Sequence, residues 1–476
     1  MTAKDSPQVL QSMLRQIEPV GASAMSPKEN TQIVEAILRQ IESAHIRTVK
    51  VTFPDLYGVA RAKAIPARHF PHVVEHGVQF AYPTFALDLA GNPAPGTGTA
   101  EEVGYADMTA IPDLSTFTVL PWEPDTAAVI ADLYFQREPI ALAPRNILKR
   151  VVAEYEKHNL LPIVGSELEF YLLKSDNGTW RTYADKPSMV YTWNATIDPD
   201  GITRKMCDAV EAMGHRALAV SHEFFPGQYE INLDHGEALD MADRTFFYKQ
   251  AVKEIAWQNG LMATFMAKPR TDLGGSGYHL HLSLADPANG ANLFYDPRSD
   301  HELSELALDF IGGQMAHARG LTAVFAPTVN SYKRYVLNAF APYYILWGYD
   351  NRTCYVRIPP ERKGGTRVEN RTPDGVANPY LAFAAALAAG LDGITRHLDP
   401  GAPFAGDAYM NADCLRTPVV PQYLHEAVTA LEADEVLCQT LGPEFVKAFG
   451  AVKRLESQRF RSHVTDWEFN EYAFHL

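Results

Sequence analysis

A pair of acidic residues in an otherwise apolar segment is the feature that most constrains the fold of this chain. Residues Leu161 to Leu173 are largely apolar and aromatic, as in a buried β-strand, and they include Glu167 and Glu169. Because side chains alternate between the faces of a strand, both carboxylates point to the same side. Neighbouring carboxylates repel each other and resist loss of water. The pair therefore indicates either a metal site or a face that is open to water.

The length and charge of the chain narrow the class of protein. Its 476 residues exceed what one compact core usually holds, so we expect two domains. With 42 basic and 57 acidic residues the net charge is −15, which argues against sequence-independent nucleic-acid binding. Four widely spaced cysteines without a CxxC pair are typical of reduced thiols. No signal segment or membrane-spanning stretch is apparent, so we expect a cytoplasmic protein with no nucleic-acid or membrane partner.

The spacing of apolar residues predicts the order of helices and strands. Residues Val9 to Ile17 have helical spacing, and a second helix is expected over about 29–44. Strands are expected from His45 to about 131, with Asp55 to Gly58 as the turn of a hairpin. A larger α+β region is expected to begin at Pro139 to Pro144. Its helices are predicted at about 145–158, 202–213, 238–259, 303–319 and 376–396.

A second pair of acidic residues flanks a Pro-Gly turn. Glu223 and Glu230 are seven residues apart, and a strand is expected to follow the turn. A hairpin here would bring both carboxylates to one site. Taken alone, a solvated turn explains this segment better.

A glycine-rich loop followed by an alternating strand carries two histidines. In the segment Gly274 to Ser283, the side chains of His279, His281 and Ser283 share one face of the predicted strand. Glycines let backbone N–H groups approach an anion. Two histidines on the polar face of a half-buried strand favour a binding role over packing.

Arginine is concentrated between residues 334 and 371, and Glu369 lies within this region. Such cations in an acidic protein indicate recognition of carboxylate or phosphate groups. The arginines expected to bind ligands are Arg334, Arg352, Arg357, Arg367 and Arg371. Oxygen ligands with one histidine suit Mg²⁺ or Mn²⁺ better than zinc.

Taken in order, these segments resemble the motifs of the glutamine synthetase family, class I type. The matching segments are 165–170, 222–223, 227–230, 275–281, 330–334, 351–352, 357–359, 367–371 and 377–381. The resemblance runs from about residue 30 to the end and implies an α+β fold. It implies a small β-grasp domain over 30–138 and a catalytic domain over 139–476 with a curved antiparallel sheet flanked by helices. Residues 1–29, which precede the resemblance, are expected to form a helical extension. It also implies a dodecamer of two hexameric rings, with each active site between neighbouring subunits.

The resemblance further implies ATP, glutamate and two Mg²⁺ (or Mn²⁺) ions as ligands. One ion would be held by Glu169, Glu223 and Glu230, and the other by Glu167, His279 and Glu369. ATP would contact His281, Ser283, Arg352, Arg357 and Arg367. Glutamate would be held by Arg334, Arg371 and the backbone at Gly275. The residues implied in catalysis are Arg352, Arg357 and Glu369, which would assist formation of γ-glutamyl phosphate.

Two positions depart from the ammonia-using members of the family. Their Phe-Asp-Gly-Ser-Ser loop corresponds here to the segment 80–85, in which Ala81 replaces the aspartate. In those members a glutamate lies six residues after the glutamate-binding arginine, and the residue at this position here is Phe340. Those members also have an asparagine before the Gly-Ser-Gly loop, and the residue there is Gly274. An ammonium ion is poorly bound without an anionic partner. We therefore expect an apolar amine pocket formed by Ala81, Tyr82, Thr84, Phe85 and Phe340.

These departures predict a ligase that joins glutamate to an organic amine, similar to the γ-glutamylanilide synthetases. An aniline-type amine fits best, because its conjugate acid loses a proton readily, and the reaction would begin degradation of an aromatic amine. Three other amines are alternatives: a small alkylamine such as isopropylamine, ethanolamine, or a polyamine. A polyamine would need an acidic partner, for which Asp55 or Asp88 could serve. An ordinary glutamine synthetase with a rebuilt ammonium site and an inactive, regulatory family member also remain open.

Overall fold

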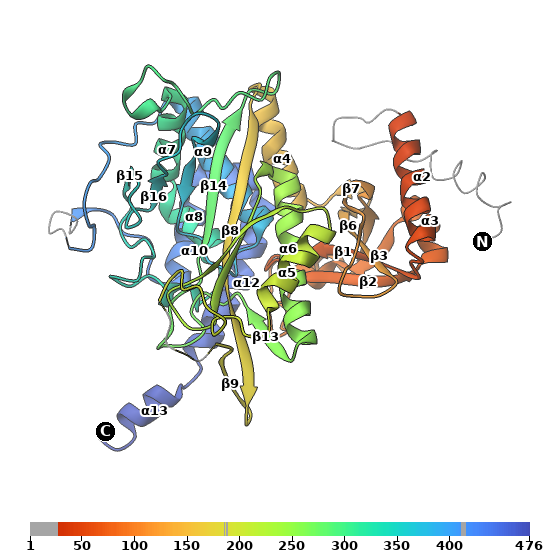
Figure 1. Cartoon of the computed structure of the whole chain (residues 1–476), viewed down its shortest axis with the longest axis horizontal. Coiled ribbons are helices and arrows are strands. Elements are labelled where there is room, and N and C mark those ends of the chain that lie inside the picture. The colour runs from red at the N-terminus through yellow and green to blue at the C-terminus, as the bar shows by residue number, and fades with distance from the viewer. Residues whose placement is uncertain (1–26, 185, 187–188, 411–415) are drawn as a thin grey trace.

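Two β-sheets organise the part of the chain that the structure describes. The computed structural model describes residues 27–184, 186, 189–410 and 416–476. Figure 1 shows the smaller sheet at one side of the molecule, the larger sheet at the centre, and the last helix projecting away from both. The helix expected over residues 9–17 lies outside the described residues.

The first sheet contains seven strands, five of them in the order β2-β1-β6-β4-β3. These are β1 (Thr48–Pro54), β2 (Ala60–Pro66), β3 (Val78–Ala81), β4 (Asp107–Pro112), β5 (Thr118–Val119), β6 (Thr126–Phe135) and β7 (Glu138–Pro139). β1 and β2 form the predicted hairpin, and its turn places Gly58 at a φ of 75°. The helices of this region are α2 (Pro27–Ser43) and α3 (Phe70–His76), and α2 confirms the expected helix at about 29–44.

The second sheet contains ten strands and is built around one long strand, β8 (Leu161–Asp176). The main order is β10-β11-β8-β14-β17-β16-β15. The other strands are β9 (Thr179–Thr182), β10 (Ala217–His222), β11 (Gln228–Leu233), β12 (Gly236–Glu237), β13 (Leu261–Thr264), β14 (Tyr278–Ala285), β15 (Trp347–Tyr349), β16 (Val356–Ile358) and β17 (Val368–Asn370). Apart from the parallel pair β15 and β16, its strand pairs are antiparallel, so the α+β expectation is confirmed.

The remaining helices follow in this part of the chain, and those predicted at about 145–158, 202–213, 238–259 and 376–396 are confirmed, whereas those after residue 396 were not predicted. The helices are α4 (Pro144–Lys157), α5 (Ile202–Ala212), α6 (Ala238–Gln258), α7 (Glu305–Ala316), α8 (Ala318–Phe325), α9 (Pro379–Arg396), α10 (Leu424–Ala433), α11 (Glu435–Leu441), α12 (Pro443–Arg461) and α13 (Asp466–Tyr472). The alanine-rich α9 is buried over most of its length, as expected. No helix among the described residues is long and apolar enough to cross a membrane.

The single helix predicted over 303–319 is wrong, because the chain breaks into α7 and α8 at His317. This residue is held between two carboxylates, with Nε2 2.9 Å from Asp392 and Nδ1 2.7 Å from Asp434. Its backbone leaves the helical region, at φ −96° and ψ 3°. The two ion pairs join distant parts of the chain, so local helical spacing could not reveal the break.

A buried arginine joins the first sheet to the helices of the second. Arg145 of α4 has a side chain only 3% exposed and forms ion pairs with Asp113, Asp132 and Asp243. Asp132 lies on β6 and Asp243 on α6, so one guanidinium connects the two regions. The domain boundary at residues 138 and 139 stays a prediction, but the two sheets are tied together close to it.

We predict that Arg145→Met lowers the free energy of unfolding by about 3–5 kcal/mol, because the buried Asp243 loses its cation and Asp113 and Asp132 keep only Lys149. Thermal denaturation measures this loss. Arg204→Met is the control, because the Arg204 side chain is 86% exposed and its removal should change stability by no more than about 0.5 kcal/mol. Equal melting temperatures for the Arg145→Met variant and the wild type would contradict this role.

Candidate active site

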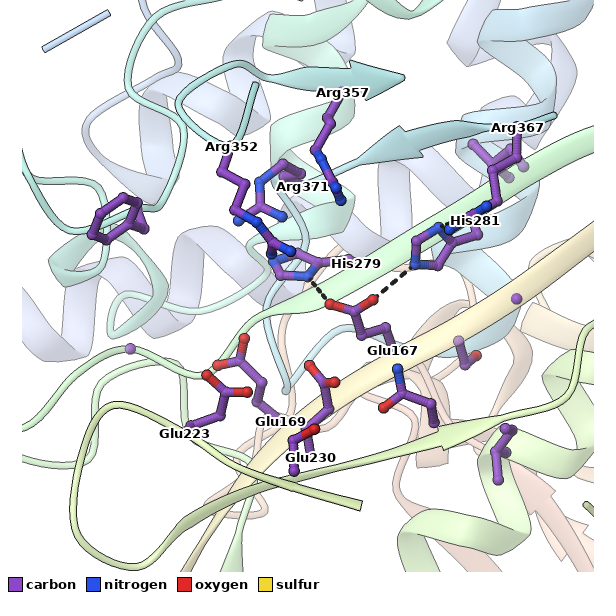
Figure 2. Close-up of a pocket in the computed structure, with 18 of the residues that line it drawn as sticks. Glu167, Glu169, Glu223, Glu230, His279, His281, Arg352, Arg357, Arg367 and Arg371 are labelled. Atoms are coloured by element: carbon purple, nitrogen blue, oxygen red, sulfur yellow. Dashed lines mark hydrogen bonds and ion pairs between the residues drawn. The ribbon is translucent and has the colours of Figure 1, made fainter. Parts of the chain in front are cut away.

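A cavity of about 1170 Å³ lies over the polar face of β8 and its neighbouring strands. Strand alternation places Glu167 and Glu169 on this face, while Leu168 and Phe170 are buried on the other. Figure 2 shows the carboxylates on one side of the cavity and the arginines on the other. The chain therefore brings acidic, histidine and arginine side chains from both parts of the sheet into one site.

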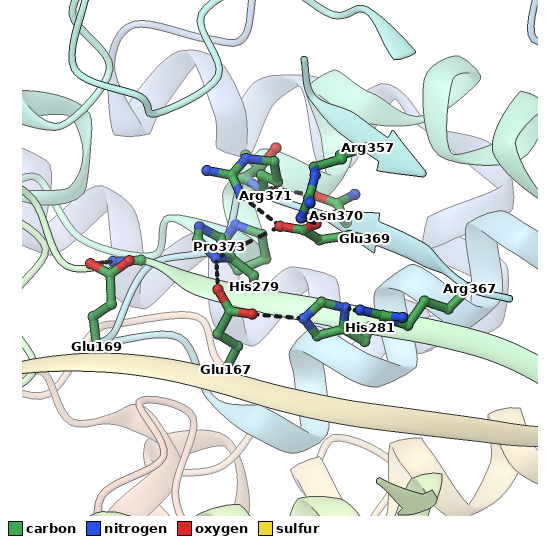
Figure 3. Close-up of polar contacts among 12 residues, drawn as sticks. Glu167, Glu169, His279, His281, Arg357, Arg367, Glu369, Asn370, Arg371 and Pro373 are labelled. Carbon is green, nitrogen blue, oxygen red and sulfur yellow. Dashed lines mark hydrogen bonds and ion pairs between the residues drawn. The ribbon is translucent and has the colours of Figure 1, made fainter. Parts of the chain in front are cut away.

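Glu167 is hydrogen-bonded to two histidines of the adjacent strand. In the β8–β14 register His279 lies opposite Glu167, and His281 follows on the same face. Nδ1 of His279 lies 2.6 Å from one oxygen of Glu167, and Nε2 of His281 lies 2.9 Å from the other (Figure 3). Burial alone would raise the pKa of Glu167, but the two histidines outweigh it and hold the pKa well below its usual range.

Glu369 is neutralised by two arginines. This carboxylate on β17 is fully buried, with Nη1 of Arg357 at 2.6 Å and Nη1 of Arg371 at 2.5 Å (Figure 3). Burial acts to raise its pKa, but Arg371 and the nearby histidines lower the pKa to about 2. Glu369 is thus a permanent anion behind the arginines that face the cavity.

Three other carboxylates lie together, and none of the arginines or lysines that the structure describes forms an ion pair with them. The hairpin of β10 and β11 forms as the sequence suggested, and Glu230 lies directly opposite Glu169 across the β11–β8 ladder. Burial and the neighbouring carboxylates raise the pKa of Glu230 to about 10 and that of Glu223 to about 7. Near pH 7 Glu230 therefore holds a proton and Glu223 is partly protonated, so a bound cation competes with protons at these two groups.

The donor atoms fit divalent cations. Ligand atoms of Glu167, His279 and Glu369 lie within 4.8 Å of one another, and so do those of Glu169, Glu230 and His279. The first group contains the three residues expected for one ion. The second contains His279 where Glu223 was expected, although Glu223 lines the same cavity. Mainly oxygen donors with one imidazole suit Mg²⁺ or Mn²⁺, and the assignment of each ligand stays a prediction.

The glycine loop holds a carboxylate of the protein itself. The N–H of Gly277 donates to Glu169 at 2.9 Å, and the side-chain amide of Gln228 donates to the same oxygen at 2.8 Å. Gln228 also donates to the carbonyl of Gly275 at 3.0 Å. The loop was expected to approach an anion, and in the structure one such anion is Glu169.

All of the residues predicted to bind metal, ATP and glutamate line this cavity except Glu369, which lies behind Arg357 and Arg371. Arg334 is only 5% exposed and is fixed by the carbonyls of Thr372 and Pro373 at 2.7 and 3.2 Å. The residues on the lining are Glu167, Glu169, Glu223, Glu230, Gly275, His279, His281, Ser283, Arg334, Arg352, Arg357, Arg367 and Arg371. Their roles as individual ligands stay predictions.

The predicted amine pocket is only partly assembled within one chain. Phe340 lines the cavity, but Ala81, Tyr82, Thr84 and Phe85 do not. Phe85 is 1% exposed and Tyr82 9%, because both rings pack in the core of the first sheet. Of these four residues, only Ala81 and Thr84 have exposed surface that could face the cavity of another copy of the chain, and the assignment of this loop stays a prediction.

Three aromatic residues of the cavity lining were not predicted from the sequence, namely Tyr191, Phe224 and Phe225. The ring of Phe224 stacks on that of Phe340, with centroids 5.9 Å apart and an angle of 9° between the planes. Phe225 lies against Gly274. Phe224 and Phe225 directly follow Glu223, so their position next to a predicted ligand was the signal that could have identified them.

Comparison with known proteins gives one consistent family. Residues 141–472 match the family described as glutamine synthetase, catalytic domain. A glutamine synthetase of Methanococcus voltae is 39% identical over 381 residues, which cover 78% of this chain and 84% of that protein. A glutamate–isopropylamine ligase of Pseudomonas sp. is 36% identical over 442 residues, covering 90% and 95%. The solved structure of GmaS without ligand is 40% identical, with a TM-score of 0.82 and coverage of 91% and 98%.

We predict that binding of Mg²⁺ or Mn²⁺ to the purified protein releases protons and strengthens as the pH rises from 6 to 8. Glu223 and Glu230, with pKa values of about 7 and about 10, must lose protons to bind a cation, so acid opposes binding. Titration calorimetry in buffers of different ionisation enthalpy measures both effects.

Glu230→Gln should weaken metal binding by at least about tenfold and reduce the proton release. Glu211→Gln, which alters an exposed carboxylate on α5, should leave both unchanged. Metal affinity that is independent of pH, without proton release, would contradict this account of the site.

Proposed function

Because this chain belongs to the glutamine synthetase family of ATP-dependent ligases, we propose that it joins the γ-carboxylate of glutamate to an organic amine, with an aromatic amine such as aniline as the best candidate. The choice of an aromatic amine is based on one observation, the stacked rings of Phe224 and Phe340 on the wall of the cavity. The product would be a γ-glutamyl amide, together with ADP and phosphate.

The first half of the proposed reaction is transfer of the terminal phosphoryl group of ATP. An oxygen of the glutamate γ-carboxylate attacks the γ-phosphorus, the bond to the β-phosphate oxygen breaks, and ADP leaves. Arg334 and the backbone at Gly275 would position glutamate, while Arg352 and Arg357 offer positive charge to the phosphate oxygens. Divalent cations at the acidic sites supply further neutralisation of the phosphates when bound.

The second half is attack of the amine nitrogen on the carbonyl carbon of γ-glutamyl phosphate. The carbon–nitrogen bond forms, the carbon–oxygen bond to phosphate breaks with its electron pair on phosphate, and the nitrogen loses a proton. An aniline-type amine is largely neutral near pH 7, so no protein group has to remove a proton from an ammonium ion before attack. The hydrocarbon part of such an amine would be stabilised against the aromatic rings by about 25 cal/mol per Å² of apolar surface buried.

The cavity wall near Phe340 does not offer what an ammonium ion needs. Phe340 is 53% exposed, and Val336 and Leu337 beside it are also exposed apolar side chains of the lining. An ammonium ion gains from carboxylate contacts, whereas an aryl or alkyl group gains from burial against apolar carbon. The apolar surface supports an organic amine over ammonia.

A small alkylamine is the second candidate, because a relative that covers 90% of this chain is a glutamate–isopropylamine ligase. A polyamine is less well supported, since its expected partners are already paired. Asp55 binds Arg61, and Asp88 binds Arg459. An inactive, regulatory protein is also poorly supported, because the acidic, histidine and arginine residues of the site converge on one cavity.

The proposed assembly of two hexameric rings would account for the residues of the amine pocket that one chain leaves apart. Ala81 is exposed on the first sheet and Thr84 is half-buried, and neither lies at the cavity of its own chain. A neighbouring subunit that places this loop over the cavity would complete the pocket.

We predict that the purified enzyme, supplied with ATP, Mg²⁺ and glutamate, releases phosphate faster with aniline-type amines than with ammonium. A screen of ammonium, alkylamines, ethanolamine, polyamines and anilines by phosphate release measures this. A higher kcat/KM for isopropylamine than for aniline would support the second candidate. A rate with ammonium above that with every organic amine would contradict the proposal.

We predict that Phe340→Glu, combined with Ala81→Asp, raises kcat/KM for ammonium by about tenfold or more and lowers that for aniline by a similar factor. The two carboxylates would bind the cation and remove apolar surface. Phe340→Leu is the matched control, because it keeps the wall apolar and should preserve the preference for organic amines. An unchanged ratio of the two substrates in the double variant would show that these positions do not select the amine.

A further inference from the structure

The loop of residues 274–277 is in close contact with functional side chains at three of its four positions. A β-carbon built on Gly275 would lie 2.6 Å from Cγ of Arg334, and one on Gly277 would lie 3.0 Å from an oxygen of Glu169. A β-carbon on Gly274 would lie 2.4 Å from two ring carbons of Phe225. Real β-carbons are hardly ever found this close to atoms to which they are not bonded, so each glycine makes room for neighbouring side chains.

At Gly274 the requirement is for space and not for backbone conformation. Gly274 does not have the positive φ that disfavours other residues. An alanine, serine or asparagine would therefore fit the backbone here if the ring of Phe225 were absent. The ring thus occupies the volume that a side chain at position 274 would take.

Phe225 is held against the loop by its own packing. It contacts a small apolar cluster that contains Tyr171, Leu173 and Leu273. The hydroxyl of Tyr171 donates to the carbonyl of Gly274 at 3.1 Å, which fixes the loop on the other side of the contact. Neither the ring nor the loop can move away without breaking this packing.

The contact determines the chemistry of one wall of the cavity. Phe225 and Gly274 both line the cavity, and Phe224 with its partner Phe340 belongs to the same lining. A side chain at position 274 would replace ring carbon with a different shape and, for serine or asparagine, with a polar group. With glycine at 274, the apolar ring of Phe225 is the surface that this position presents to the cavity.

We infer that Phe225 and Gly274 form a matched pair that determines substrate specificity, with the Phe225 ring as a wall for the hydrocarbon part of the acceptor amine. The inference rests on the proposed function, in which glutamate lies at Gly275 and Arg334, next to this pair. Under this inference Phe225 helps to select the amine, and Phe225 lies on the same chain as the acidic cluster. Phe225 acts by filling space, and it takes no part in the chemical steps.

Four variants of the full-length enzyme test the pair: Gly274→Ala, Phe225→Ala, the double variant and Phe225→Leu. We expect Gly274→Ala to lower the melting temperature by about 2 °C or more through overpacking, and the double variant to recover most of this loss. The melting temperature reports the contact without depending on activity.

Steady-state kinetics with aniline and isopropylamine test the effect on specificity. Phe225→Ala should lower the ratio of kcat/KM for aniline over isopropylamine by about tenfold, with the change mainly in KM for the amine. KM for glutamate should change by less than about twofold. Phe225→Leu should retain most of the wild-type ratio, because leucine keeps the wall apolar, and Phe474→Ala, which removes a ring that is 89% exposed, should leave the ratio unchanged.

The outcomes separate this inference from the proposed function. Additive changes in melting temperature would show that the two residues are not a matched pair. Coupled melting temperatures with an unchanged amine ratio in Phe225→Ala would overturn the specificity role alone. A wild-type enzyme that uses only ammonium would overturn the proposed function itself, whatever the melting temperatures show.

Discussion

Crowding of carboxylates on the polar face of β8 is the constraint on which the rest of the site depends. Two unit charges 4 Å apart interact by about 4 kcal/mol at an effective dielectric constant of 20, so several such groups cannot all be ionised without cations. The chain supplies partners for two of them, two arginines that pair with Glu369 and two histidines that hydrogen-bond to Glu167. Burial and mutual repulsion leave Glu223 and Glu230 with raised pKa values. The protein therefore provides partners for Glu167 and Glu369, whereas Glu223 and Glu230 are left for metal ions.

The glycine loop connects this charged cluster to the apolar part of the cavity. At Gly277 it contacts Glu169, and at Gly275 it lies against the stem of Arg334. At Gly274 it lies against Phe225, whose neighbour Phe224 stacks on Phe340. One short segment thus borders the groups proposed to bind metal, glutamate and amine, which explains why three of its four residues lack a side chain.

Local periodicity predicted much of the fold. It also predicted part of the site, because strand alternation alone places Glu167 with Glu169 and His279 with His281. The pairing of Glu230 with Glu169 depends on the register of two strands about 60 residues apart, which no local pattern contains. The break at His317 likewise arises from ion pairs with Asp392 and Asp434. Phe224 and Phe225 were missed because a turn has no periodicity from which the direction of a side chain can be predicted. The motifs indicated the charged half of the site far better than its apolar half.

The central claim is that the charged half of the cavity activates glutamate while the aromatic half selects an organic amine. The most direct measurement is a competition in which the enzyme, ATP, Mg²⁺ and glutamate meet equal concentrations of ammonium and aniline, with both products quantified by mass spectrometry. This account predicts γ-glutamylanilide as the main product and glutamine as a minor one. Glutamine as the main product would contradict it.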